Sequence, residues 1–134
     1  MINMINAYNV SQQTVAVGDG LVFDGLNFGK NRCFCNTTNN NFMVTRNGTY
    51  SIRVNTNVTP TIAGQITLNL VASGTDLTGG EIQLPGAVVG TYDNGSAEVI
   101  VNLFAGTRIS LVNNSANPVT FSAAGTSIVI NRIA

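Results

Sequence analysis

The 134-residue sequence lacks histidine and tryptophan altogether, and only 9% of its residues are charged. The absence of histidine excludes Ser-His-Asp triads, imidazole general bases and histidine-ligated metal sites. The six basic and six acidic residues cancel to a net charge of zero, and the basic residues occur singly, so no basic patch predicts nucleic-acid binding. Because charge repulsion helps to keep proteins apart, a surface this poor in charge is typical of a chain held in a defined assembly.

Long apolar stretches are also absent. No segment approaches the ~20 apolar residues that a membrane-spanning helix needs, so we expect no membrane partner. The first residues, MINMINAYN, lack the basic region and the long apolar core of a secretory signal peptide. We therefore expect synthesis in a host cytoplasm, followed by release through lysis or by assembly into a particle.

Acidic side chains are too few and too scattered to indicate catalysis. Nothing in the spacing of the six favours a carboxylate pair for glycoside hydrolysis, so we expect neither an enzyme nor a cofactor. The oxygens of Asp19 and Asp24, or of Asp93 and Asn94, offer an alternative interpretation as calcium ligands. Nearby glycines favour ordinary turns at Asp19 and Asp93 instead.

The two cysteines, Cys33 and Cys35, are separated by a single residue. A disulfide across so short a loop would be strained, and two thiols alone do not complete a metal site. We favour two buried free thiols that pack as small apolar groups. A disulfide between subunits is the alternative.

The sequence is dominated by alternation of apolar and polar residues, the pattern of half-buried strands. TYSIRVNTNV places Tyr50, Ile52 and Val54 on one face, and QITLNLVA and AEVIVNLF repeat the pattern. Turn signals such as Asn47-Gly48 and Pro85-Gly86 separate these runs, and no helical period is visible. We predict an all-β fold, an antiparallel jelly-roll sandwich of roughly eight to ten strands over residues 14–134. The strand segments expected are 14–17, 21–29, 32–36, 41–45, 49–58, 65–72, 80–84, 87–92, 96–104, 107–113, 119–122 and 126–133, some of them halves of one bent strand.

Two of the expected strands are apolar on both faces. In AEVIVNLF, Ile100 and Phe104 oppose a second apolar row, and in the terminal TSIVINRIA the same holds for Ile128 and Ile130. The outer face of a sandwich should be polar. A second apolar face therefore predicts burial against another copy of the chain.

The segment Gly48-Thr49-Tyr50-Ser51-Ile52 resembles the Gly-x-Tyr strand of the tumour necrosis factor/complement-type jelly roll, with the apolar strand FMVTRN before it. The later order is also similar, with EVIV, GTRISL and an apolar terminal strand. The likeness, over roughly residues 15–134, is strongest to the C-terminal domain of collagen-like exosporium glycoproteins of bacterial spores. It implies a TNF-like homotrimer with the terminal strand near the threefold axis. The interface residues expected on this basis are Tyr50, Ile100, Phe104, Ile128, Ile130 and Arg132, the last either paired with a carboxylate such as Glu98 or solvated.

The sequence departs from the exosporium pattern because it has no collagen-like Gly-X-Y stalk. We therefore expect a free-standing trimer, similar to a decoration or head-fibre protein on a bacteriophage capsid. This hypothesis describes a non-enzymatic structural protein of the virion surface, bound to the major capsid protein or another particle-surface protein. Its docking arm would be residues 1–13, with Met1, Ile2, Met4, Ile5 and Tyr8 as contacts. The alternatives are a spore exosporium surface protein and a carbohydrate- or receptor-binding head domain that stacks glycans on Tyr8 and Tyr92.

Overall fold

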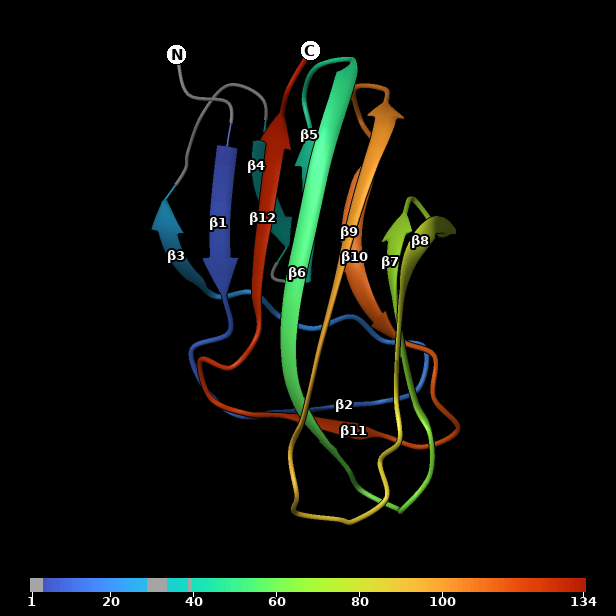
Figure 1. Ribbon diagram of the computed structural model, residues 1–134. Coiled ribbons are helices and arrows are strands. Elements are labelled where there is room, and N and C mark those ends of the chain that lie inside the picture. Colours follow the sequence, from blue (N-terminus) through green and yellow to red (C-terminus); the bar gives the residue numbers. More distant parts are fainter. Residues whose placement is uncertain (1–3, 29–33, 39) are drawn as a thin grey trace.

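The computed structural model describes residues 4–28, 34–38 and 40–134. These residues form two packed antiparallel sheets (Figure 1), and none of them is helical. The described part of the chain accordingly contains no helix long and apolar enough to cross a membrane. The strands are β1 (Met4–Tyr8), β2 (Gln13–Val15), β3 (Gly25–Phe28), β4 (Phe34–Thr38), β5 (Asn41–Val44), β6 (Gly48–Pro60), β7 (Ile66–Ala72), β8 (Thr75–Leu84), β9 (Asp93–Leu103), β10 (Arg108–Asn113), β11 (Val119–Phe121) and β12 (Ser127–Arg132).

The strand order confirms the predicted antiparallel jelly-roll sandwich. The five-stranded sheet runs β4-β5-β10-β7-β8, and the seven-stranded sheet runs β2-β11-β6-β12-β1-β3, with β9 on the free side of β6. Every pairing between these strands is antiparallel. The long strand β6 organises the larger sheet, because it pairs with β12 and β11 along one edge and with β9 along the other.

The core lies between the two sheets and takes every second residue of the central strands. On β6 the buried residues are Tyr50, Ile52 and Val54, and on β12 they are Ile128 and Ile130. The hydroxyl of Tyr50 donates to the carbonyl oxygen of Arg46 at 2.7 Å, so its burial leaves that group satisfied. The expectation that Tyr50, Ile128 and Ile130 lie between subunits is wrong, because one chain already removes all three from solvent.

The N-terminal segment is part of the sandwich rather than a free arm. Strand β1 pairs with β12 along one edge and with β3 along the other, and Ile5 and Ala7 are buried in the core. A docking arm over residues 1–13 would have to break both ladders, so the structure corrects that boundary for residues 4–8. Met1 and Ile2 lie outside the described residues.

Two further segments differ from the sequence-based expectation. Strand β8 begins at Thr75, well before the expected residue 80, and the expected strand 87–92 is a loop. Val88 and Val89 in that loop are exposed, so their apolar character does not come from a buried strand face. The twelve described strands are β1, which the sequence did not predict, and β2 to β12, which correspond to the other eleven expected segments.

Buried asparagines fix the loops at the ends of the strands. The Nδ2 of Asn9 donates to the carbonyl oxygens of Ser11 and Ser122, and its Oδ1 accepts from the Thr126 amide at 3.0 Å. Asn113 works in the same way, donating to Val15 and accepting from the Ser115 amide. The Asn-rich composition thus supplies side chains that replace missing backbone partners in loops.

Candidate interaction surface

The seven-stranded sheet has a second side, which faces away from the core and is called the open face here. Its side chains alternate with the core residues of the strands. On β12 they are Val129 and Asn131. On β6 they are Ser51, Arg53 and Asn55, and on β9 they are Ser96, Glu98, Ile100 and Asn102. The face is thus a mixture of small polar groups and a few apolar ones.

Ile100 and Phe104 are the apolar residues that stand out at this side of the sheet. Ile100 lies opposite Ser51 in the β6–β9 ladder and is 67% exposed, and Phe104 directly after β9 is 75% exposed. Both belong to the residues predicted to make subunit contacts, and the described part of the chain leaves most of each side chain exposed.

An ion pair sits next to this apolar pair. Arg53 lies between Val129 and Glu98 in the ladders, and its Nε is 3.7 Å from the Glu98 Oε2. The two side chains are 60% and 55% exposed, so solvent screens their attraction. It is the salt bridge found among the described residues, and it joins Glu98 to Arg53 rather than to Arg132, the partner suggested by the sequence.

Arg132 lies partly exposed at the end of the sheet, the place named by the solvated alternative. Its Nε and Nη2 donate to the carbonyl oxygen of Asn47, at 3.3 and 3.0 Å, at the end of the sheet where β6 begins. Glu98 instead pairs with Arg53. Arg132 therefore ties the terminal strand to the β5–β6 loop within one chain.

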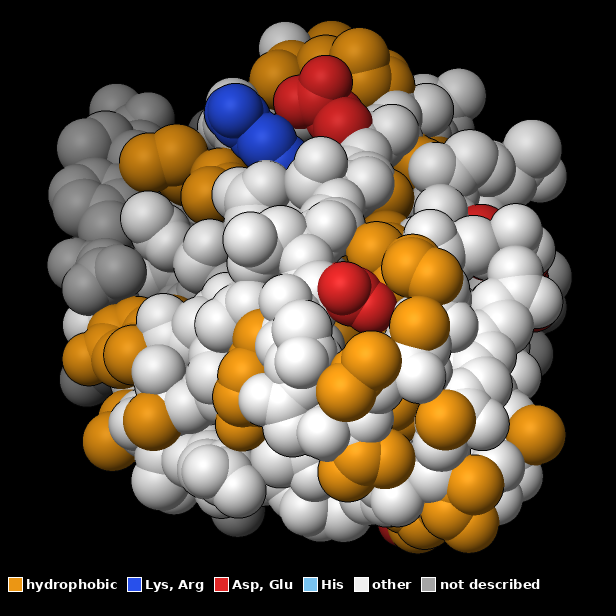
Figure 2. Space-filling model, turned by 60° about the horizontal axis from the view of Figure 1, so that its bottom comes forward, with side chains coloured by type: hydrophobic (Ala, Val, Ile, Leu, Met, Phe, Trp, Pro, Cys, Tyr) orange, Lys and Arg blue, Asp and Glu red, His pale blue; other side chains and the backbone are white. Residues whose placement is uncertain are grey.

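The β6–β7 and β8–β9 loops lie at the end of the sandwich opposite the two termini (Figure 1), and they carry further exposed apolar residues. Ile62 lies in the β6–β7 loop, and Val88 and Val89 lie in the β8–β9 loop; all three are more than half exposed. The two loops adjoin, because the Gly64 amide donates to the carbonyl oxygen of Gly86 at 2.9 Å. Figure 2, in which this end is turned forward, shows scattered apolar side chains and few charged ones.

The remaining candidate side chains take structural positions. Asp24 accepts a hydrogen bond from the Val10 amide at 2.8 Å, and Asp93 accepts one from the Gly86 amide at 3.1 Å. Both carboxylates therefore accept from backbone amides of other loops, 14 and 7 residues away in the sequence. Within the described ranges, no three His, Cys, Asp or Glu side chains cluster to hold a metal ion. Cys33 lies outside the described residues.

The two tyrosines proposed to stack on sugars have different surroundings. Tyr8 lies against β3: a Cβ built at Gly25 would be 2.5 Å from its ring carbon Cζ. Its ring therefore rests on the backbone of the neighbouring strand. Tyr92, at the end of the β8–β9 loop, is 38% exposed.

Comparison with known proteins identifies the fold. No family model and no curated protein matches the sequence. Among solved structures, murine APRIL superposes with a TM-score of 0.78 at 12% identity, over 99% of this chain and 100% of that one. The globular domain of zebrafish complement 1qA protein gives 0.77 at 10% identity, over 100% and 98%. Eiger TNF from S. frugiperda gives 0.72 at 14%, over 99% and 93%.

These likenesses span nearly the whole chain at low sequence identity, so they show the fold. They confirm the tumour necrosis factor/complement-type jelly roll that the sequence resembles. Shared fold does not transfer a partner or an activity.

Proposed function

We propose that the protein is a homotrimeric, non-enzymatic structural protein that decorates the surface of a particle, and that its subunits meet through the open face of the seven-stranded sheet. The observation that carries the proposal is the exposure of Ile100 and Phe104 beside that face. The resemblance stated above implies a trimer, and a chain so poor in charge is suited to a fixed assembly.

The energy available at this contact can be bounded. Fully burying one Ile or Phe side chain stabilises by about 1.5–3 kcal/mol. Ile100 and Phe104 are only two-thirds to three-quarters exposed, so together they supply about 2–4 kcal/mol per subunit. This free energy is enough to make association of the subunits depend on the two side chains. A stable trimer also requires contacts from the rest of the open face.

The Arg53–Glu98 pair gives such a contact a defined register. A neighbouring subunit that covered it would remove both charges from water, which costs free energy, but each charge would keep its partner. Removing one partner would then leave the other charge buried alone. We therefore expect the pair to contribute to alignment of the subunits more than to their affinity.

Oligomeric state tests the first half of the proposal. The wild type should sediment as a trimer, and Ile100→Asp should give folded monomers, because a carboxylate would be forced into an apolar contact. Val17→Asp is the matched control, since Val17 is 50% exposed in the loop after β2, away from the open face. A trimeric Ile100→Asp variant would place the subunit contact elsewhere.

For the second half, we propose a bacteriophage capsid as the particle. The support is the low charge of the chain, which suits a protein held in a fixed assembly on a particle. Because β1 is locked into the sheet, docking on the capsid would use a surface other than residues 4–8. The genes beside the coding sequence should encode capsid proteins, and purified virions should contain this chain. Sporulation genes in that position would favour the exosporium alternative.

A further inference from the structure

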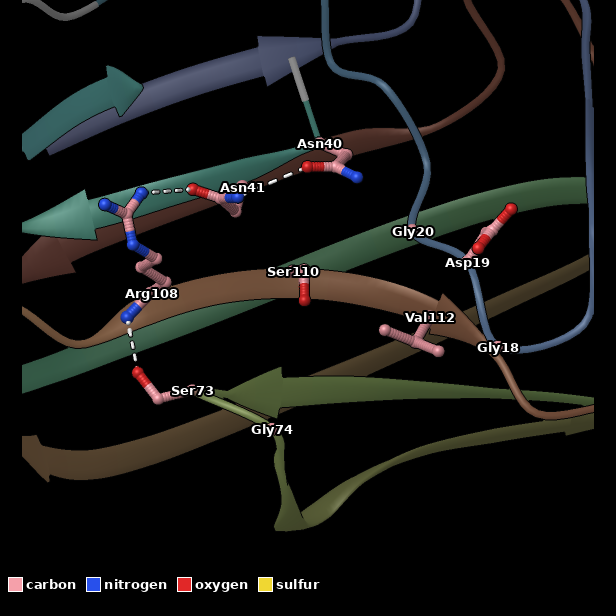
Figure 3. Close-up of a pocket in the computed structure, with 10 residues that line it drawn as sticks. All are labelled: Gly18, Asp19, Gly20, Asn40, Asn41, Ser73, Gly74, Arg108, Ser110 and Val112. Atoms are coloured by element: carbon pink, nitrogen blue, oxygen red, sulfur yellow. Dashed lines mark hydrogen bonds between the residues drawn. The ribbon is translucent and has the colours of Figure 1, made fainter. Parts of the chain in front are cut away.

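A polar hollow lies on the solvent side of the five-stranded sheet. Its floor is the outward face of β10, formed by Arg108, Ser110 and Val112, and its volume is about 290 Å³. Figure 3 shows the segment with Asp19 and the start of β5 with Asn40 along one side, and the β7–β8 turn along the other. The hollow belongs to the sheet that the proposed subunit contact leaves free.

The walls of the hollow are fixed by the backbone. The amide of Gly18 donates to the carbonyl oxygen of Asn113 at 2.8 Å, and the Asn113 amide donates back to the carbonyl oxygen of Asp19 at 3.0 Å. Gly20 allows the close approach of this segment to β5, because a Cβ there would lie 3.3 Å from the Asn40 carbonyl oxygen. The site is therefore preformed rather than assembled by a ligand.

A chain of hydrogen bonds orients the side chains at one end. Arg108 Nη1 donates to Asn41 Oδ1 at 3.1 Å, and Asn41 Nδ2 donates to Asn40 Oδ1 at 3.2 Å. The Nδ2 group of Asn40 is thereby turned away from Asn41 and remains a donor. Among the described residues, neither the Asp19 carboxylate nor the Ser110 hydroxyl takes part in a hydrogen bond.

The chemistry of these groups selects a class of ligand. The hollow offers a carboxylate that only accepts, an amide NH₂ and a guanidinium that donate, and a hydroxyl that does both. With one negative and one positive side chain, it favours neither anions nor cations. A ring bearing several neutral hydroxyl groups matches all four, since each hydroxyl donates and accepts. The volume lies at the lower end of the ~300–1,000 Å³ of small-molecule sites, which suits one small ring.

From this arrangement we propose that the hollow binds one neutral sugar unit of a glycan. None of the described residues that line it is aromatic, so the proposed contact relies on hydrogen bonds rather than on stacking. A hexose-sized ligand without stacking should bind with a dissociation constant on the order of 1 mM. The site is complete within a single chain. Its occupancy therefore does not depend on the trimer or on the particle proposed above.

The test combines a glycan array with ligand-observed NMR on the full chain, both in EDTA. The wild type should bind a set of neutral glycans, and the corresponding monosaccharide should show saturation transfer. Asp19→Asn, which keeps the shape and removes the charged acceptor, should weaken binding at least tenfold. Ser110→Ala should weaken it several-fold. Glu81→Gln is the matched control, an exposed acid of β8 outside the hollow, and should bind as the wild type does.

Three results would overturn the proposal: no neutral glycan bound by the wild type, Asp19→Asn binding with unchanged affinity, or binding that appears only when calcium replaces EDTA. The last outcome would assign recognition to a bound cation instead of the side chains. A monomeric protein that still binds sugar through Asp19 would refute the trimer while leaving the sugar site intact, so the two failures are distinguishable.

Discussion

A substitution at Ile130 tests most sharply whether this residue belongs to the core of one subunit or to the contact between subunits. Ile130 is fully buried within the single chain, on β12 between β6 and β1. Truncating a buried Ile to Ala removes its transfer free energy and leaves a cavity, which costs about 2–5 kcal/mol. We expect Ile130→Ala to lower the free energy of unfolding by about 3 kcal/mol and to leave the mass of the assembled protein unchanged. Val129→Ala, one residue along and half-buried on the open face, should cost about 1 kcal/mol or less.

Urea unfolding followed by far-UV circular dichroism measures this difference, because the chain has no tryptophan to report on its tertiary structure. If the protein is a trimer, its stability depends on concentration, so all variants must be compared at the same protomer concentration. The reasoning would be refuted by an Ile130→Ala variant that unfolds like the wild type but dissociates. That result would place Ile130 between subunits and would contradict its burial in one chain.

Three further predictions concern the packing within the subunit. Deleting residues 1–13 removes β1 and its two ladders, so the truncated chain should lose its cooperative thermal transition; a well-folded product would restore the docking-arm hypothesis. Gly25→Ala places a methyl group against the Tyr8 ring and should lower the free energy of unfolding by about 1–3 kcal/mol. In a double-mutant cycle, Tyr8→Ala should recover part of this loss, and simple additivity of the two changes would mean that the two residues do not touch. Asn9→Ala leaves buried backbone groups of the Ser122–Thr126 loop without partners and should cost about 2–3 kcal/mol in the same urea assay; an unchanged midpoint would contradict that clamp.

The fold could be predicted from the sequence because apolar and polar residues alternate wherever one face of a strand is buried. Tyr50, Ile52 and Val54 were assigned correctly to one face of one strand. What alternation cannot decide is which apolar face meets the second sheet and which meets solvent or another subunit. Ile128, Ile130 and Ile100 look alike in the sequence, yet two of them are buried in the core and the third is exposed.

The missed elements have equally specific causes. In β1 only Ile5 and Ala7 are buried, and such a short alternation near the terminus resembles a free segment. Val88 and Val89 suggested a strand, but Pro85 and two glycines surround them and the backbone forms a loop. The polar hollow joins Asp19, Asn40 and Ser110, which are far apart along the chain. Only the register of β10 against the neighbouring segments brings them together.

The central claim is that three copies of the chain share the open face, and sedimentation equilibrium tests it most directly. The account predicts a particle of about 42 kDa, three times the 14.0 kDa subunit, that persists on dilution and falls to the subunit mass in Ile100→Asp. A stable 14.0 kDa wild-type particle across the same concentrations would contradict it.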